Sequence, residues 1–127
     1  DYLALPVRIT RSSALGIAED IKRQERIIQV AKAHGAAHYI NPANGAHLYN
    51  EERFALEGMT LRFLRMDPDL RYPQQGKTDF VPGLSMLDIL MNVPPEGIRA
   101  LLARYTLHTE AELALLTPRP EDPAQSE

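Results

Sequence analysis

The 127-residue chain has 14 Lys and Arg residues against 17 Asp and Glu residues, a formal net charge of -3, and 44% hydrophobic residues. Without excess positive charge to neutralise phosphates, composition argues against nucleic acid as a main partner. The absence of Cys excludes disulfides, thiolate catalysis and Cys-ligated metals. No apolar run approaches the roughly 20 residues of a membrane helix. These features predict a soluble, cytoplasmic protein without a membrane span.

The N-terminal half alternates strand and helix patterns. Residues 2–9 alternate and include β-branched side chains, which predicts a strand with Pro6 at a sheet edge or bulge. From about Ala18 to His34, apolar positions share one helical face, and Gly35 follows as a helix stop. Residues 37–40 predict a short strand that ends in the turn-forming segment 41–45.

The next predicted elements repeat this order. Asn50 can cap a short helix that ends at Gly58, and residues 59–64 predict another strand. A helix between successive strands indicates βαβ units and parallel pairing. The predicted fold class is therefore α/β, with a short, mostly parallel sheet, packed helices and a C-terminal helical segment.

The second half has a different pattern. Residues 67–78 form a long loop with two Pro and one Gly, and long loops in compact domains are often functional. Ser85 and Asp88 have the spacing of a capping box at the start of a helix. A second helix is predicted from Pro94 to Tyr105, and a third over residues 110–116, after Thr109.

Domain organisation follows from these elements. Residues 1–116 are predicted to form a single α/β domain, with a disordered tail over residues 117–127, which are rich in Pro and acidic side chains. One core is expected to hold five apolar residues from different predicted elements. These are Ile21, Ile28, Phe63, Leu87 and Leu101.

Few motifs suggest a cofactor. His34 and His38 are four residues apart, but Gly35 interrupts the helix that would place them on one face, so no metal site and no other cofactor is predicted. Ser12 and Ser13 form either an anion-binding turn or a plain polar turn. Segment 41–45 is either a connector or a ligand-binding loop, and it lacks the phosphate-loop pattern.

Several short motifs occur in the order and spacing of a known family. They are HGAAHYI at residues 34–40 with the loop to Gly45, then Tyr49, Phe54, Gly58 and Met59, YPQ at 72–74, and FVPGLSMLDILMN at 80–92. From about Ile9 to Arg104 the sequence resembles the C-terminal portion of the WbqC-like proteins. The resemblance implies a bacterial protein of cell-surface polysaccharide biosynthesis, with a transferase on an activated sugar as the implied activity.

The sequence is compatible with three hypotheses about the function. The first is a transferase whose substrate is a nucleotide-linked or lipid-linked sugar. The second is a non-catalytic WbqC-like fragment or binding subunit, because no clear pair of nucleophile and base is present. The third is a homo-oligomer in which the first predicted strand pairs across a dimer.

A substrate pocket is predicted between the 41–45 loop and the 72–80 loop. Each loop follows a predicted strand, and the carboxyl ends of parallel strands gather ligand groups at one edge of a sheet. Ser12, Lys22 and Arg26, in and near the first predicted helix, would bind an anionic group of the substrate. Alternatively, Lys22 and Arg26 only form a solvent-exposed face of that helix. In the second loop, polar side chains would bind hydroxyls and an aromatic ring would pack on a sugar or base. The predicted substrate-binding residues are Ser12, Lys22, Arg26, Asn41, Tyr72, Gln74, Phe80 and Asn92.

Overall fold

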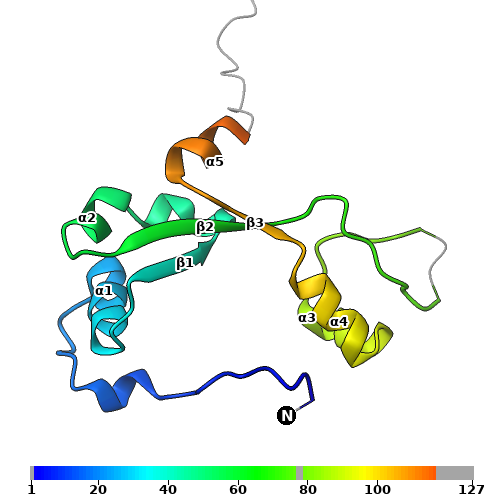
Figure 1. Cartoon of the computed structure of the whole chain (residues 1–127), viewed down its shortest axis with the longest axis horizontal. Coiled ribbons are helices and arrows are strands. Elements are labelled where there is room, and N and C mark those ends of the chain that lie inside the picture. The colour runs from blue at the N-terminus through cyan, green and yellow to red at the C-terminus, as the bar shows by residue number, and fades with distance from the viewer. Residues whose placement is uncertain (1, 77–78, 117–127) are drawn as a thin grey trace, which may run out of the picture. The chain divides into compact units, whose positions relative to one another are not determined.

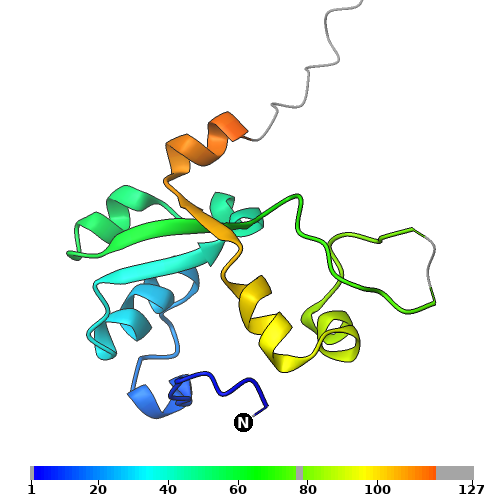
Figure 2. The same cartoon turned by 45° about the vertical axis from the view of Figure 1, so that its right-hand side comes forward.

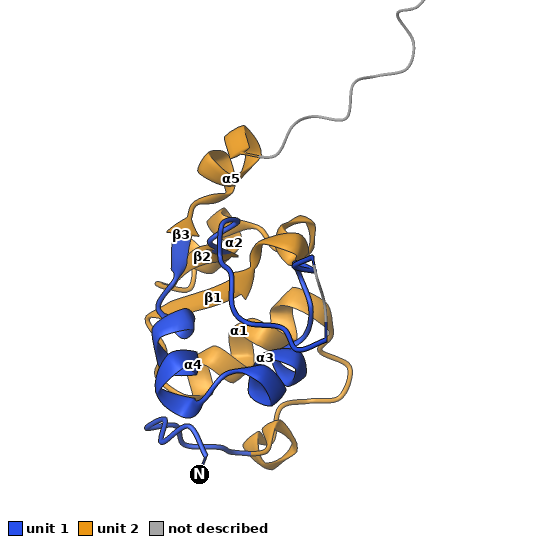
Figure 3. Cartoon of the chain, turned by 90° about the vertical axis from the view of Figure 1, so that its right-hand side faces the viewer, with its two compact units in different colours: residues 1–10, 66–106 blue, residues 11–65, 107–127 orange. Residues whose placement is uncertain are grey.

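The structure, a computed structural model, describes residues 2–76 and 79–116 (Figure 1). The chain divides into two compact units (Figure 3). Unit 1 comprises residues 1–10 and 66–106, and unit 2 comprises residues 11–65 and 107–127. The single domain over residues 1–116 stays a prediction, and the predicted tail at 117–127 lies outside the described residues.

Unit 2 holds most of the regular structure. Its elements, two of which extend into unit 1, are the 3₁₀ helix η1 (Ser12–Leu15), α1 (Arg23–Ala33), β1 (His38–Pro42), the 3₁₀ helix η2 (Ala43–Leu48), α2 (Glu51–Ala55), β2 (Thr60–Met66), β3 (Tyr105–His108) and α5 (Glu110–Leu116). Unit 1 contributes α3 (Met86–Asn92) and α4 (Pro95–Leu102), which lie side by side (Figure 2).

The three strands form one sheet in the order β1-β2-β3. β1 and β2 are parallel, with His38 opposite Thr60 and Pro42 opposite Leu64. A parallel pair needs a crossover connection, and α2 lies between the two strands in the chain. The predicted α/β class, with parallel pairing of these two strands and a C-terminal helix, is therefore confirmed.

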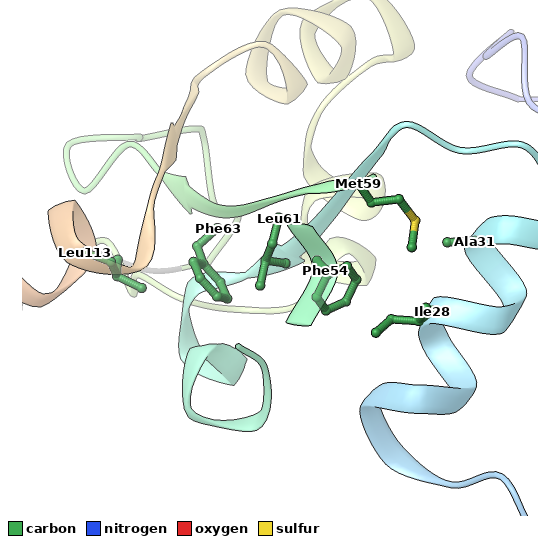
Figure 4. Packing of buried hydrophobic residues seen from close by; sticks show 7 residues of the cluster. All are labelled: Ile28, Ala31, Phe54, Met59, Leu61, Phe63 and Leu113. Atoms are coloured by element: carbon green, nitrogen blue, oxygen red, sulfur yellow. The ribbon is translucent and has the colours of Figure 1, made fainter. Parts of the chain in front are cut away.

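The core of unit 2 lies between the helices and β2 (Figure 4). Alternate residues Leu61 and Phe63 of β2 are buried, as the two-residue period of a strand requires. They pack with side chains from α1, α2 and α5. The buried cluster comprises Ile28, Ala31, Phe54, Met59, Leu61, Phe63 and Leu113.

Local sequence signals fix several helix ends. Asn50 Oδ1 accepts a hydrogen bond of 2.8 Å from the Arg53 backbone N–H, so the predicted cap of α2 is confirmed. At α5, Thr109 Oγ1 accepts from Glu112 N at 3.2 Å and Glu112 Oε2 accepts from Thr109 N at 2.8 Å. This reciprocal capping box explains why the third predicted helix has its predicted bounds.

The predicted strand at residues 2–9 is wrong. This segment contains no strand; Pro6 lacks an N–H donor, and Ala4 has a positive φ of 49°, which extended backbone does not adopt. The apolar side chains that suggested burial are exposed, by 68% at Val7 and 89% at Ile9. The proposed pairing of a first strand across a homo-oligomer therefore loses its structural basis.

Other element boundaries also differ from the prediction. α1 begins at Arg23, not near Ala18, and α4 ends at Leu102, so that Tyr105 opens a strand absent from the prediction. β3 has only four residues, and a short apolar run does not separate strand from helix by its period. Pairing with β2 makes this segment a strand.

The predicted five-residue core is also partly wrong. Ile28 and Phe63 are fully buried in unit 2, but Leu87 is 66% exposed. Ile21 and Leu101 are half-buried and belong to different units. Helical spacing identified an apolar face on α3, but spacing does not show whether another element covers that face.

Candidate functional site

The two loops of the predicted pocket belong to different units. Segment 41–45 lies in unit 2, and the loop that holds Tyr72, Gln74 and Phe80 lies in unit 1. The pocket that would join them stays a prediction. Within each unit, however, the surroundings of the predicted residues are well defined.

In unit 1, three of the four predicted residues converge on Asp88 of α3. The Tyr72 hydroxyl donates to Asp88 Oδ2 at 2.7 Å, and Gln74 Nε2 donates to the same oxygen at 3.2 Å. Asn92 Nδ2 donates to Asp88 Oδ1 at 3.3 Å and to the Asp88 carbonyl at 2.7 Å. Burial and the hydrogen bond to Asp88 raise the pKa of Tyr72 above its ordinary value.

The same side chains also hold the loop backbone. Gln74 Nε2 donates to the Val81 carbonyl and Gln74 Oε1 accepts from Val81 N, both at 2.9 Å. Asn92 Oδ1 accepts from Gln75 N at 2.9 Å. Much of the hydrogen-bonding capacity of Gln74 and Asn92 therefore serves to fasten the loop to α3.

This network replaces the predicted capping box. α3 begins after Ser85 as predicted, but the Ser85 side chain makes no capping hydrogen bond. The Asp88 carboxylate is instead occupied by the donors from the loop and from Asn92. The spacing of Ser85 and Asp88 was thus a correct signal for the helix start and a wrong one for the role of Asp88.

Phe80 packs within the same loop. Its ring meets Tyr72 edge to face, with centroids 5.2 Å apart, and the Arg71 guanidinium lies 4.9 Å from its centroid. Tyr72 and Phe80 border a cavity of about 280 Å³ whose other walls include Leu70, Leu84 and Ile89. The cavity is mainly apolar, so it offers few groups for binding sugar hydroxyls.

In unit 2, the predicted anion-binding residues do not form one group. Ser12 is exposed on η1, and Lys22 is the exposed residue that precedes α1. Lys22 therefore does not share a helical face with Arg26, contrary to the prediction. Arg26 lies within α1, and its Nη1 donates to the Ala18 carbonyl at 3.2 Å.

Asn41 has a structural position. It is only 9% exposed, and its Nδ2 donates to the Pro42 carbonyl at 2.9 Å. A Cβ on Gly45 would lie 2.6 Å from that nitrogen, so the absence of a side chain at Gly45 makes room for the amide. The 41–45 segment is thus held by Asn41, and residues after it line the neighbouring surface.

One cleft in unit 2 contains Arg26 and is named the arginine cleft. It has a volume of about 710 Å³, and its walls include Arg23, Arg26, Ile27, His47, Leu48 and Tyr49. Of the described residues, no carboxylate lines it. The nearby Glu25 carboxylate is bound by Arg53, with 2.6 Å between Oε2 and Nη2. The cleft is therefore locally cationic in a chain of net negative charge.

A second cleft in unit 2 lies where β1 and β2 end, and is named the carboxyl-end cleft. It has a volume of about 580 Å³ and is bordered by Asn44 and His47 of η2, Arg65 of β2 and Glu110 of α5. Side chains that follow parallel strands are expected at this edge of a sheet. Within unit 2, α5 thus forms one wall of the carboxyl-end cleft. His47 borders this cleft and the arginine cleft.

An aromatic cluster supports the arginine cleft. The Tyr49 ring lies 5.7 Å from that of Tyr39 and 6.2 Å from that of Phe54, measured between centroids. Burial, with the hydrogen bond and charge of Tyr49, raises the pKa of Tyr39 to about 12. The Tyr49 ring that borders the arginine cleft therefore packs against two other aromatic rings.

The raised pKa of Tyr39 predicts a loss of stability at alkaline pH. In the unfolded chain the hydroxyl ionises near 10.0, whereas in the folded protein it stays protonated to about 12. Because the unfolded state then binds fewer protons, the free energy of unfolding should fall as pH rises through this interval. Denaturant unfolding across it should show a smaller fall for Tyr39→Phe. An equal fall in both proteins would contradict the assignment to Tyr39.

Sequence reasoning missed Arg23, His47, Tyr49 and Arg65 as candidate site residues. Arg23 and Arg26 are three residues apart, the spacing of neighbours on a helix, and this signal was available in the sequence. Arg65 lies three residues after Arg62 in β2 and had no distinctive signal, because only the fold brings it beside η2 and α5.

Within residues 2–76 and 79–116, no helix is long and apolar enough to cross a membrane. Over the same residues, no group of three or more His, Cys, Asp or Glu side chains is arranged to hold a metal ion.

Comparison with known proteins gives one family. Neither a curated protein nor a solved structure matches the chain. The model of the WbqC-like protein family matches residues 1–100. This match covers most of the 127 residues and includes all eight predicted binding residues. The match is not to a C-terminal portion of the family alone, so this narrower part of the prediction is not supported. The chain belongs to the WbqC-like protein family.

Proposed function

We propose that this protein is a cytoplasmic transferase of bacterial cell-surface polysaccharide biosynthesis, and that it binds the diphosphate of an activated sugar in the arginine cleft. One observation carries the proposal: Arg23 and Arg26 both line a cleft that no carboxylate borders among the described residues. Guanidinium groups bind phosphate oxygens through paired, charge-assisted hydrogen bonds.

The chemistry of the cleft favours a nucleotide-linked sugar over a lipid-linked one. The Arg23 side chain has no hydrogen-bond or ion-pair partner among the described residues. Beside the two arginines, the Tyr49 ring offers a flat surface for a base, with Ile27 and Leu48 adding apolar contact. A polyprenyl chain would need a longer apolar surface than these two side chains supply.

The backbone of Arg23 adds a second argument. Its φ of 52° lies in the left-handed region, which is uncommon for a residue other than Gly. Such a conformation costs about 1–3 kcal/mol and is concentrated at binding sites. In this proposal, the strained backbone at Arg23 serves to direct its side chain into the cleft.

Isothermal titration calorimetry with UDP-glucose tests the proposal. Each of Arg23→Gly and Arg26→Gln should weaken binding about tenfold or more, because a hydrogen bond to a charged group contributes about 1.5–3 kcal/mol. Arg23→Gly should not lower the melting temperature, since Gly adopts positive φ readily. Arg99→Gln, at an exposed position of α4, is the matched control and should bind like the unchanged protein.

Further arms of the experiment separate the alternatives. Geranyl diphosphate presents a diphosphate without a base, so tighter binding of it than of UDP-glucose would favour a lipid-linked donor. Release of UDP from UDP-glucose in the presence of a membrane or cell extract would support a transferase. Binding without turnover under the same conditions would support the non-catalytic binding subunit. Unchanged affinity in Arg23→Gly and Arg26→Gln would refute the arginine cleft as the site.

A further inference from the structure

The carboxyl-end cleft contains two opposite charges that do not neutralise each other. Arg65 and Glu110 both border it, and no ion pair joins them. Neither side chain has a hydrogen-bond or ion-pair partner among the described residues. Its volume of about 580 Å³ falls in the range of roughly 300–1,000 Å³ that is usual for small-molecule sites.

Other charged side chains on the same strand and helix have partners in the described part of the chain, unlike Arg65 and Glu110. Arg62, on the same strand as Arg65, donates to Glu51 Oε1 at 3.2 Å and to the Leu61 carbonyl at 2.6 Å. Glu112, on the same helix as Glu110, is used in the capping box with Thr109. On β2 and α5, the charged side chains that do not border the cleft, Arg62 and Glu112, therefore form hydrogen bonds. The two that border it, Arg65 and Glu110, form none with described residues.

We propose that the carboxyl-end cleft binds an α-amino acid as a zwitterion. The Arg65 guanidinium binds the carboxylate in a paired geometry, and the Glu110 carboxylate binds the ammonium group. Apolar side chains of Ala43, Ala46, Leu113 and Leu116 border the same cleft and offer contact for an aliphatic side chain. A ligand with a single charge would leave either Arg65 or Glu110 without a partner.

This inference does not depend on the proposed nucleotide site. Of the described residues, only His47 borders both clefts, and neither Arg23 nor Arg26 lines the carboxyl-end cleft. Loss of amino-acid binding would therefore leave UDP-glucose binding in place, and the two proposals fail separately.

Titration of the ¹⁵N-labelled full chain, followed by NMR, tests the proposal with three matched ligands. L-Leucine carries both charges, L-leucinamide lacks the carboxylate, and N-acetyl-L-leucine lacks the ammonium group. L-Leucine should shift amide signals of residues 43–47, 65 and 110–116. Each analogue should bind at least about tenfold more weakly, because it leaves one charged partner unpaired.

Variants assign each charge to its partner. Arg65→Gln should bind L-leucine and L-leucinamide with similar affinity, and Glu110→Gln should do the same for L-leucine and N-acetyl-L-leucine. This selective loss of discrimination is a coupling that a general structural effect would not produce. The control variants Arg99→Gln and Glu96→Gln, both exposed on α4, should retain full discrimination.

Three outcomes would overturn the proposal. The first is that L-leucine at millimolar concentration shifts no amide signals of residues 43–47, 65 and 110–116. The second is that all three ligands bind with equal affinity. The third is that the variants still distinguish L-leucine from its analogues as the unchanged protein does. Circular dichroism of each variant verifies that it is folded. Should Arg65→Gln fail to fold, the Glu110→Gln comparison and the three ligands on the unchanged protein still decide the matter.

Discussion

Phe54→Ala is expected to lower the free energy of unfolding by about 3–5 kcal/mol, the cost of deleting a fully buried aromatic ring. The Phe54 side chain is 0% exposed. It stacks on Tyr39 with 5.4 Å between ring centroids and an interplanar angle of 10°, and it meets Tyr49 edge to face. Its removal therefore leaves a cavity under the aromatic surface of the arginine cleft.

Chemical denaturation measures this effect, and a nearby position provides the control. Leu56, at the end of the same helix, is 82% exposed, so Leu56→Ala should change the free energy of unfolding by less than about 0.5 kcal/mol. Phe54→Leu should fall between the two, because it retains apolar volume without the ring stacking. Similar stability of Phe54→Ala and Leu56→Ala would show that the Phe54 ring does not lie in the core.

Asp88→Ala is expected to release the 72–81 loop of unit 1 from α3. The carboxylate accepts hydrogen bonds from Tyr72, Gln74 and Asn92, and donors left without an acceptor cost about 1–3 kcal/mol. Backbone amide exchange should become faster at Gln75 and Val81, whose N–H groups donate to Asn92 and Gln74.

Two further variants test the cause of this effect. Asp79 lies in the same loop with an exposed side chain, so Asp79→Ala should leave the exchange at Val81 unchanged. Asp88→Asn keeps one acceptor oxygen and should have an intermediate effect. Equal exchange rates in Asp88→Ala and the unchanged protein would mean that Gln74 and Asn92 hold the loop without the carboxylate.

Much of the fold was predictable because local signals agree with tertiary contacts. The Asn50 cap, the Thr109 capping box and the Gly35 helix stop each act through backbone atoms a few residues away. The parallel pairing of β1 and β2 followed from the alternation of elements. The strand predicted for residues 2–9 does not form, because an alternating pattern forms a strand only where a partner strand is present.

The candidate site was less predictable, for a different reason. The predicted substrate-binding role of Tyr72, Gln74 and Asn92 stays a prediction. The sequence did not reveal that these side chains bond to Asp88 and to the loop. Residue types show which hydrogen bonds a side chain is able to make. They do not show which of those bonds the folded chain has already made.

By itself, the sequence determined the family, the α/β class and the ends of several helices, because motif order, element order and capping act over short chain distances. Tertiary structure alone decided the two clefts. Arg65 and Glu110 are far apart in the chain, and so are Arg26 and Tyr49, yet each pair borders one surface. Whether a charged side chain is engaged or available depends on neighbours that only the packed sheet and helices bring into reach.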